Sequence, residues 1–151
     1  MSDFKKITLS LGEILELEAE LNGARNNITG DVYTEGLLKQ KLPIKTKYWL
    51  TRLSETTSSE KRTIENLRDE LVIKYGQKNE DGTFSIPLKI KNANGDLVAN
   101  PAFGEFSNQY NQLLETKKEI EYSEINLDEL ANIETSDNYA VFFKLLTISS
   151  T

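Results

Sequence analysis

The sequence predicts an α+β fold that is mostly helical, with a long antiparallel helix pair joined by a β-hairpin and with short terminal strands. Two observations predict the helices: apolar residues recur at helical spacing over residues 43–75 and again over 101–114. A third predicts the hairpin, because Asn94-Gly95 separates two alternating segments and both residues accept positive φ. No linker divides the chain, so we expect one domain over residues 1–151, with the hairpin as an insertion at about 83–99.

The first elements are a strand and a short helix. Residues 4–9 alternate and include β-branched side chains, as is typical of a strand. Ser10 and Glu13 have the spacing of a capping box, in which each side chain accepts a hydrogen bond from a free N–H at the helix start. The helix is expected to end at Gly23, and the polar residues 24–31 are expected to form a loop.

The long helix has an unusual centre. Residues 33–38 suggest one or two helical turns, and Pro43 suits the first turn of the next helix. That helix is expected to reach Gly76, although its middle, residues 54–63 (SETTSSEKRT), has no apolar residue. We interpret this middle as a spacer or contact segment, and a break near residues 54–59 is the alternative. The expected apolar stripes are Ile44, Tyr48 and Leu53, then Ile64, Leu67, Leu71 and Tyr75.

The segment after Gly76 changes from helix to strand. Residues 83–86, 88–90 and 96–99 alternate, and Pro87 favours a sheet edge or a bulge. Asn100-Pro101 then has the cap and proline of a helix start. The next helix should pack its apolar stripe against the second stripe of the long helix; this stripe comprises Phe103, Phe106, Tyr110, Leu113 and Leu114.

The C-terminal part alternates short elements. Residues 120–122 are expected to form a strand that pairs with the N-terminal strand, and residues 127–133 a helical turn. Ser136 is expected to cap a last helix that carries apolar residues from Tyr139 to Ile148.

Composition excludes several classes of function. The chain has no cysteine and no histidine, which removes disulfides, thiolate metal sites and the commonest general base. Its net charge of −6 disfavours nucleic acid as a partner. No apolar run is long enough for a membrane span, and the N-terminus lacks the apolar region of a signal peptide. We therefore expect a protein that stays in the cytosol or leaves it as part of an assembly.

The carboxylates do not form a catalytic pattern. Those of residues 13–20 and 119–124 alternate with apolar residues, as on a solvated helix or strand face, whereas acid–base chemistry needs a desolvated pair. Calcium-loop spacing and glycine-rich phosphate loops are also absent. We expect no enzyme activity and no catalytic, metal-binding or cofactor-binding residue.

Four apolar residues are the candidates for partner binding: Trp49, Phe84, Ile86 and Leu97. Trp49 follows Tyr48, so it lies at the edge of the helix stripe or outside it, where a tryptophan can anchor an interface. The alternative is that Trp49 packs against the N-terminal helix. The hairpin carries more apolar surface than two free strands can hide, so it lies either on its own domain or against another chain.

Three segments carry a resemblance to a known family: LPIKTKYWLTRL, RDELVIKYGQKNEDGTFSI and FGEFSNQYNQLLETKKEIEYSEINLDEL. Over residues 41–130 the chain resembles a family of small tailed-bacteriophage proteins of unassigned function. The resemblance implies a phage or prophage origin and supplies no site. We expect a non-enzymatic phage structural or assembly protein, in the virion or the host cytoplasm, whose partners are other phage structural proteins or itself. The alternative is a phage accessory protein that binds and inhibits or redirects a host factor.

Overall fold

The computed structural model describes residues 4–25, 29, 32–34, 36–126 and 139–147. The fold is α+β and mostly helical, as predicted. The chain divides into two compact units: the first comprises residues 1–61 and 117–151, and the second comprises residues 62–116. The expectation of a single domain stays a prediction.

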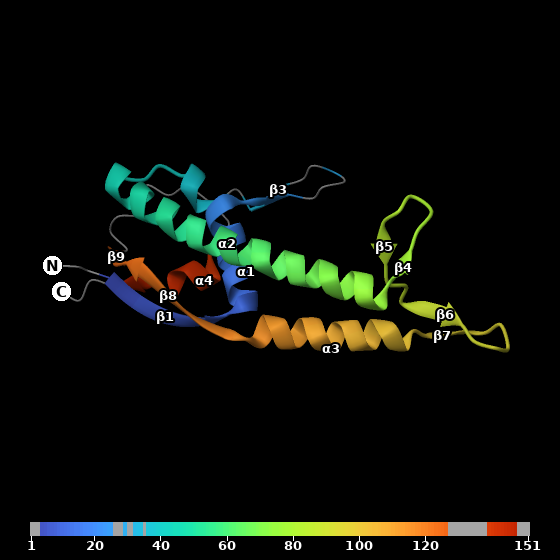
Figure 1. The fold of residues 1–151 in the computed structure, drawn as a ribbon. Coiled ribbons are helices and arrows are strands. Elements are labelled where there is room, and N and C mark those ends of the chain that lie inside the picture. Colours follow the sequence, from blue (N-terminus) through green and yellow to red (C-terminus); the bar gives the residue numbers. More distant parts are fainter. Residues whose placement is uncertain (1–3, 26–28, 30–31, 35, 127–138, 148–151) are drawn as a thin grey trace. The chain divides into compact units, whose positions relative to one another are not determined.

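The first unit contains a two-stranded ribbon made by segments far apart in the sequence (Figure 1). Strand β1 (Phe4–Ser10) pairs antiparallel with β8 (Lys117–Ser123), with Phe4 opposite Ser123 and Ile7 opposite Ile120. The predicted pairing of the terminal strands is confirmed. Leu9 and Ile120 are almost fully buried, so one face of the ribbon contributes to the core of this unit.

Helix α1 (Leu11–Asn22) begins with the predicted capping box. The Ser10 N–H donates to Glu13 Oε1 and the Glu13 N–H donates to Ser10 Oγ, both at 3.1 Å. The helix ends where the Gly23 N–H donates to the Ala19 carbonyl at 2.7 Å. Four apolar side chains of α1 form the centre of the core: Leu11, Ile14, Leu17 and Leu21.

Helix α2 (Ile44–Tyr75) is continuous, as predicted, and the alternative of a break near residues 54–59 is excluded. The predicted first stripe was wrong at two of its three positions, because Ile44 is 83% exposed and Tyr48 is 54% exposed, whereas Leu53 is buried as expected. The buried face passes instead through Thr46, Leu50, Leu53, Ser54 and Thr57. At 100° per residue these positions lie on one side of the helix, opposite Ile44 and Tyr48.

One face of the apolar-free centre of α2 is buried, which corrects its interpretation as a spacer. Thr57 is fully buried and Ser54 is 8% exposed. The Ser54 hydroxyl donates to Asn22 Oδ1 on α1 at 2.9 Å, and Lys61 Nζ donates to Glu18 Oε2 at 3.2 Å. Small hydroxyl side chains let α1 and α2 pair through hydrogen bonds where apolar residues were expected to be required. We call Glu18, Asn22, Ser54, Thr57 and Lys61 the polar seam.

The remaining elements of the first unit are short. They are β2 (Ala24–Arg25), β3 (Val32–Thr34), the 3₁₀ turn η1 (Leu37–Lys39), β9 (Ile125–Asn126), α4 (Ala140–Phe143) and β10 (Leu146–Thr147). Three predictions were therefore wrong. The last helix, expected to carry apolar residues from Tyr139 to Ile148, ends at Phe143, and Leu146 lies in β10. The expected loop over residues 24–31 starts with a strand that pairs with β3, and Tyr33 lies in a strand where a helical turn was expected. The predictions for residues 127–133 and for Ser136 fall outside the described residues.

The second unit is built on two helices that lie side by side and run antiparallel (Figure 1), as predicted. They are the part of α2 that follows Lys61 and α3 (Pro101–Glu115). Ile64 is buried, but Leu67 is 38% exposed, so the expectation that Leu67 is a core residue was wrong. The apolar stripe of α3 is only half-buried along its whole length.

Two β-hairpins connect these helices, where the sequence predicted one over residues 83–99. Strand β4 (Gln77–Lys78) pairs with β5 (Phe84–Ser85), and β6 (Lys89–Lys91) pairs with β7 (Leu97–Ala99), both antiparallel. Residue 76, which follows α2 and lies close to Ser85 of β5, must be glycine. A Cβ there would lie 2.3 Å from the Val72 carbonyl oxygen. Gly95 has a φ of 81°, as the predicted tight turn requires.

Candidate interaction surfaces

The buried carboxylates of the first unit are engaged in holding the fold. Glu20 accepts hydrogen bonds from the backbone N–H groups of Val141 at 3.2 Å and Phe142 at 2.8 Å. The N-cap residue of α4, Tyr139, makes no side-chain capping hydrogen bond, and Glu20 takes this capping role. Burial raises the pKa of Glu20, and the two backbone donors oppose this effect. A carboxylate committed to two backbone donors is a structural group rather than a general base.

Glu13 and Glu18 also have structural partners. Lys144 Nζ lies 2.5 Å from Glu13 Oε2, and this contact, with the Ser10 N–H, lowers the pKa of Glu13. Glu18 belongs to the polar seam. Among the residues that the structure describes, no three Asp or Glu side chains are grouped so that they could hold a metal ion.

Trp49 lines a pocket in the first unit. The pocket has a volume of about 270 Å³ and lies between α2 and the β1–β8 ribbon. Trp49 is half-buried, with its ring edge-on to Phe4 at 5.4 Å and to Tyr48 at 4.9 Å between centroids. Trp49 is thus neither a core residue nor fully exposed. The residues that line the pocket are Phe4, Trp49, Arg52, Leu53, Glu55, Thr56, Glu121, Tyr122 and Ser123.

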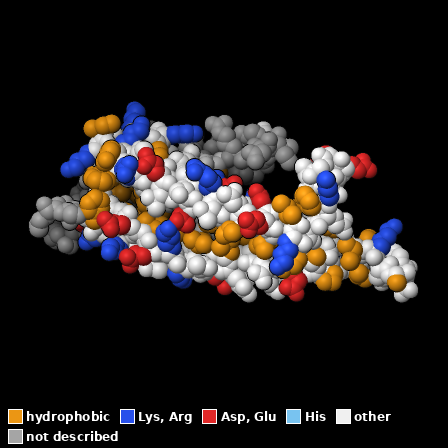
Figure 2. All heavy atoms as spheres, viewed as in Figure 1, with side chains coloured by type: hydrophobic (Ala, Val, Ile, Leu, Met, Phe, Trp, Pro, Cys, Tyr) orange, Lys and Arg blue, Asp and Glu red, His pale blue; other side chains and the backbone are white. Residues whose placement is uncertain are grey.

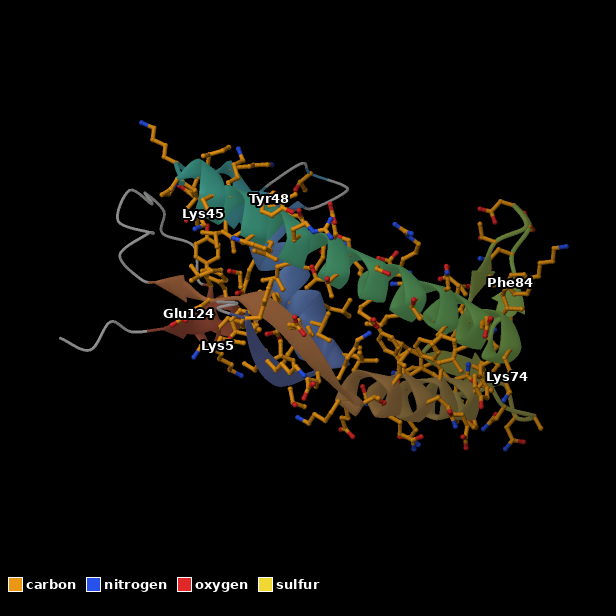
Figure 3. All side chains as sticks on the ribbon, turned by 60° about the vertical axis from the view of Figure 1, so that its left-hand side comes forward. Lys5, Lys45, Tyr48, Lys74, Phe84 and Glu124 are labelled. Carbon is orange, nitrogen blue, oxygen red and sulfur yellow. The ribbon has the colours of Figure 1, made fainter. Side chains whose placement is uncertain are left out.

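The pocket combines aromatic walls with charges of both signs at its rim. Arg52 and Glu55 are exposed and form an ion pair at 3.1 Å, so neither charge is offered alone to a ligand. Burial raises the pKa of the Tyr122 hydroxyl, and the carboxylate of Glu124 adds to this effect. Figure 3 labels Tyr48 on α2 and Glu124 just after β8, both in this unit. The pocket volume of about 270 Å³ is just below the range of about 300–1,000 Å³ that is typical of small-ligand sites.

The second unit carries an apolar surface on its hairpins. Leu88 and Leu97 are each 65% exposed, Phe84 is 38% exposed, Val98 is exposed and Ile86 is half-buried. We call these five residues the hairpin surface. Figure 2 shows hydrophobic side chains gathered over the hairpin end of this unit, and Figure 3 labels Phe84 there beside Lys74.

The half-buried face of α3 shows that the apolar residues of the second unit are incompletely covered. Phe106 and Tyr110 stack with their ring centroids 5.8 Å apart, and Phe103 lies 6.2 Å from Phe106. All three rings are half-buried, whereas Ile64 is buried. Two antiparallel helices cannot enclose their own apolar faces, which is why bundles of three or four helices are the usual stable form.

Three of the four predicted partner-binding residues lie in the second unit. Phe84, Ile86 and Leu97 belong to the hairpin surface, whereas Trp49 belongs to the other unit. Leu88 and Val98 were not selected from the sequence: Leu88 precedes β6, and Val98 directly follows Leu97, so that the two side chains point to opposite faces of β7. Phe4 and Tyr122 were not predicted as neighbours of Trp49, because that contact depends on the pairing of β1 with β8.

No helix within the described part of the chain has the length and apolar character needed to cross a membrane. Comparisons with protein-family models, with curated proteins and with solved structures give no match for this chain.

Proposed function

We propose that this protein acts without catalysis, through protein–protein contacts made by the hairpin surface. The observation that supports this proposal is the exposure of Leu88 and Leu97, which project from short hairpins and are not required to fill a core. Exposed apolar side chains gather at the hairpin end of this unit (Figure 2), and such surfaces are typical of interaction sites. The incomplete burial of α3 in the same unit gives further support, because a partner there would cover apolar residues.

The proposed setting is a phage particle or its assembly pathway, with other structural proteins or a second copy of this chain as partners. This setting depends on the resemblance of residues 41–130 to small tailed-phage proteins. Assembly proteins act through surfaces, which agrees with a chain that has neither histidine nor cysteine and whose buried glutamates have structural roles.

Mass spectrometry of purified particles from the source phage or prophage tests the proposal. We expect the chain at a fixed copy number per particle, and we expect a Leu88→Lys/Leu97→Lys double variant to be lost from particles while it remains folded. Ile44→Lys, at an 83% exposed site outside the hairpin surface, is the matched control and should be incorporated like the wild type.

The same experiment decides on the alternative, a phage accessory protein that binds a host factor. A chain absent from particles but recovered in a stoichiometric complex with one host protein supports that alternative. Normal incorporation of the double variant contradicts the assignment of the contact to the hairpin surface.

A further inference from the structure

Strand β7 has an exposed edge without protective charge. All three of its residues, Leu97, Val98 and Ala99, are exposed. Within the described residues, β7 pairs with β6 and with no other strand. Natural edge strands usually carry charged residues, prolines or bulges that prevent pairing with another chain. An uncharged, apolar edge is therefore a candidate site for strand addition.

The hydrogen-bond pattern of the hairpin shows which groups point outward. The Asn92 N–H donates to the Asp96 carbonyl at 2.9 Å, and the Asn100 N–H donates to the Leu88 carbonyl at 3.0 Å. Bonded and non-bonded pairs alternate in an antiparallel ladder, so Val98 bonds inward to its partner Ile90. The N–H and C=O groups of Leu97 and Ala99 then point away from β6, towards the free edge.

The opposite edge of the hairpin has a different character. Strand β6 reads Lys89-Ile90-Lys91, and all three of its residues lie opposite the residues of β7. Self-pairing along β6 would bring lysines of two copies together, and like charges placed across a ladder are destabilising. Self-pairing along β7 brings only Leu, Val and Ala together. Charge thus selects β7 over β6 as the edge that can meet its own copy.

We propose that β7 pairs antiparallel with β7 of a second copy of this chain, with Val98 on the twofold axis. Leu97 then lies opposite Ala99 of the partner subunit, and Ala99 opposite Leu97 of the partner subunit. Both of these are outward-pointing positions, so each pair exchanges two hydrogen bonds and the register agrees with the observed pattern. The result is a four-stranded sheet in the order β6, β7, β7, β6.

The flanking residues allow this register. Asp96 lies opposite Asn100 of the partner subunit, so no two like charges face each other across the axis. The hairpin is also held in shape before it pairs, because Asn92 Oδ1 accepts hydrogen bonds from the N–H groups of Asn94 at 2.9 Å and Asp96 at 3.0 Å. A preorganised edge loses less conformational freedom on binding.

Three residues per strand make a small interface, well below the roughly 1,200–2,000 Å² that specific stable complexes bury. The contact is therefore expected to be weak in dilute solution and to need trapping for detection. The partner inferred here for the proposed contact function is a second copy of this chain. The pairing of β7 with β7 does not depend on the proposed function, but its biological purpose rests on it.

The chain has no cysteine, so a single introduced cysteine reports on one position. Two Val98 Cα atoms facing each other as a non-bonded pair lie about 4.5 Å apart, within the range for a disulfide. Two Leu97 Cα atoms, offset by two residues, lie about 8–9 Å apart, which is too far to bridge. We expect Val98→Cys in a glutathione buffer to form about tenfold more disulfide dimer than Leu97→Cys, because only the former pair has bridging geometry. Asn94→Cys, at the exposed hairpin tip, measures random collision.

Equal dimer yields from Val98→Cys and Asn94→Cys would overturn the proposal. A yield from Leu97→Cys above that of Val98→Cys would also overturn it, because the register would be wrong.

Two separate proline variants, at residues that lie opposite each other in the hairpin, give an independent test. Each is made in the Val98→Cys background. Leu97→Pro removes an outward N–H from β7, and Lys91→Pro removes the outward N–H of its partner residue on β6. We expect Leu97→Pro to reduce the disulfide yield to the Asn94→Cys level and Lys91→Pro to leave it unchanged. Loss with both prolines or with neither would contradict pairing through β7. If the yield stays at collision level while particle incorporation continues, this inference fails and the proposed function stands.

Discussion

Glu20→Ala is expected to destabilise the first unit strongly, because Glu20 is the cap of a helix that has none of its own. The carboxylate is 8% exposed and accepts the N–H groups of Val141 and Phe142, about 120 residues away in the sequence. It thereby fixes α4 to α1. Truncation to alanine leaves two buried backbone donors without their acceptor.

The magnitude follows from these two donors. Each buried donor that loses its partner costs about 1–3 kcal/mol, and removal of a desolvated carboxylate returns part of that cost. The expected loss in the free energy of unfolding is therefore about 2–4 kcal/mol at neutral pH. Glu20→Gln keeps one acceptor oxygen and should lose about half as much.

Urea unfolding followed by the fluorescence of Trp49, the single tryptophan, measures this loss in the first unit. Glu16→Ala is the matched control, since Glu16 is an exposed glutamate on the same helix and should change the free energy by less than about 0.5 kcal/mol. A loss from Glu20→Ala as small as that of the control would refute the capping role.

The pH dependence gives a second check on Glu20. Burial raises its pKa in the folded state above the unfolded value of about 4.3, so the protonated form is favoured by folding. This contribution to stability is fully present below the unfolded pKa and is lost as the pH rises through the folded pKa. The difference between wild type and Glu20→Ala should therefore be larger at pH 4 than at pH 7. The opposite trend would show that the backbone donors outweigh burial.

Three further predictions concern the other contacts. Lys144 lowers the pKa of Glu13, so their pairing stabilises the fold above the unfolded pKa of Glu13, and this stability is lost as the pH falls through the folded pKa. The destabilisation caused by Glu13→Gln, measured by urea unfolding, should therefore shrink towards pH 3. A destabilisation that does not change with pH would contradict the pairing. Ser54→Ala should cost about 1 kcal/mol by leaving Asn22 Oδ1 unpaired, whereas the exposed Thr51→Ala should cost less than about 0.5 kcal/mol; equal costs would refute the polar seam. Ile64→Ala should cost about 2–4 kcal/mol and Leu67→Ala less than about 1.5 kcal/mol by thermal unfolding, and the reverse order would mean that the burial of these two residues is misassigned.

Local signals in the sequence predicted the elements that depend on local chemistry. The capping box of Ser10 and Glu13, the cap and proline at Asn100-Pro101 and the turn at Asn94-Gly95 all use contacts within a few residues. The pairing of β1 with β8 was predicted as well, from the alternation of residues 4–9 and 120–122.

The errors arose where the sequence carries no local signal for a contact. One face of the polar centre of α2 is buried against α1, where Asn22 and Glu18 supply hydrogen-bond partners, and composition alone cannot reveal such partners. Ile44 and Tyr48 were assigned to the core by their apolar character, although Leu50 and Leu53 define the buried side. One hairpin was predicted and two are present, because Phe84 and Ser85 pair with the preceding strand β4. The residues of β4, Gln77 and Lys78, have no strand signal of their own.

The candidate site was predictable in part. Alternation identified Phe84, Ile86 and Leu97, but the outward direction of the Leu97 and Ala99 backbone groups required the observed ladder. The Trp49 pocket also needed the structure, since its walls come from β1, α2 and β8.

The central claim is that the hairpin surface makes the contact through which this protein acts. The most direct test counts copies of the chain per purified particle, by quantitative mass spectrometry, for the wild type and for Leu88→Lys/Leu97→Lys. The account predicts a fixed, stoichiometric copy number for the wild type and near-complete loss of the folded double variant. A wild-type chain that is absent from particles, or a double variant incorporated at the wild-type level, would contradict it.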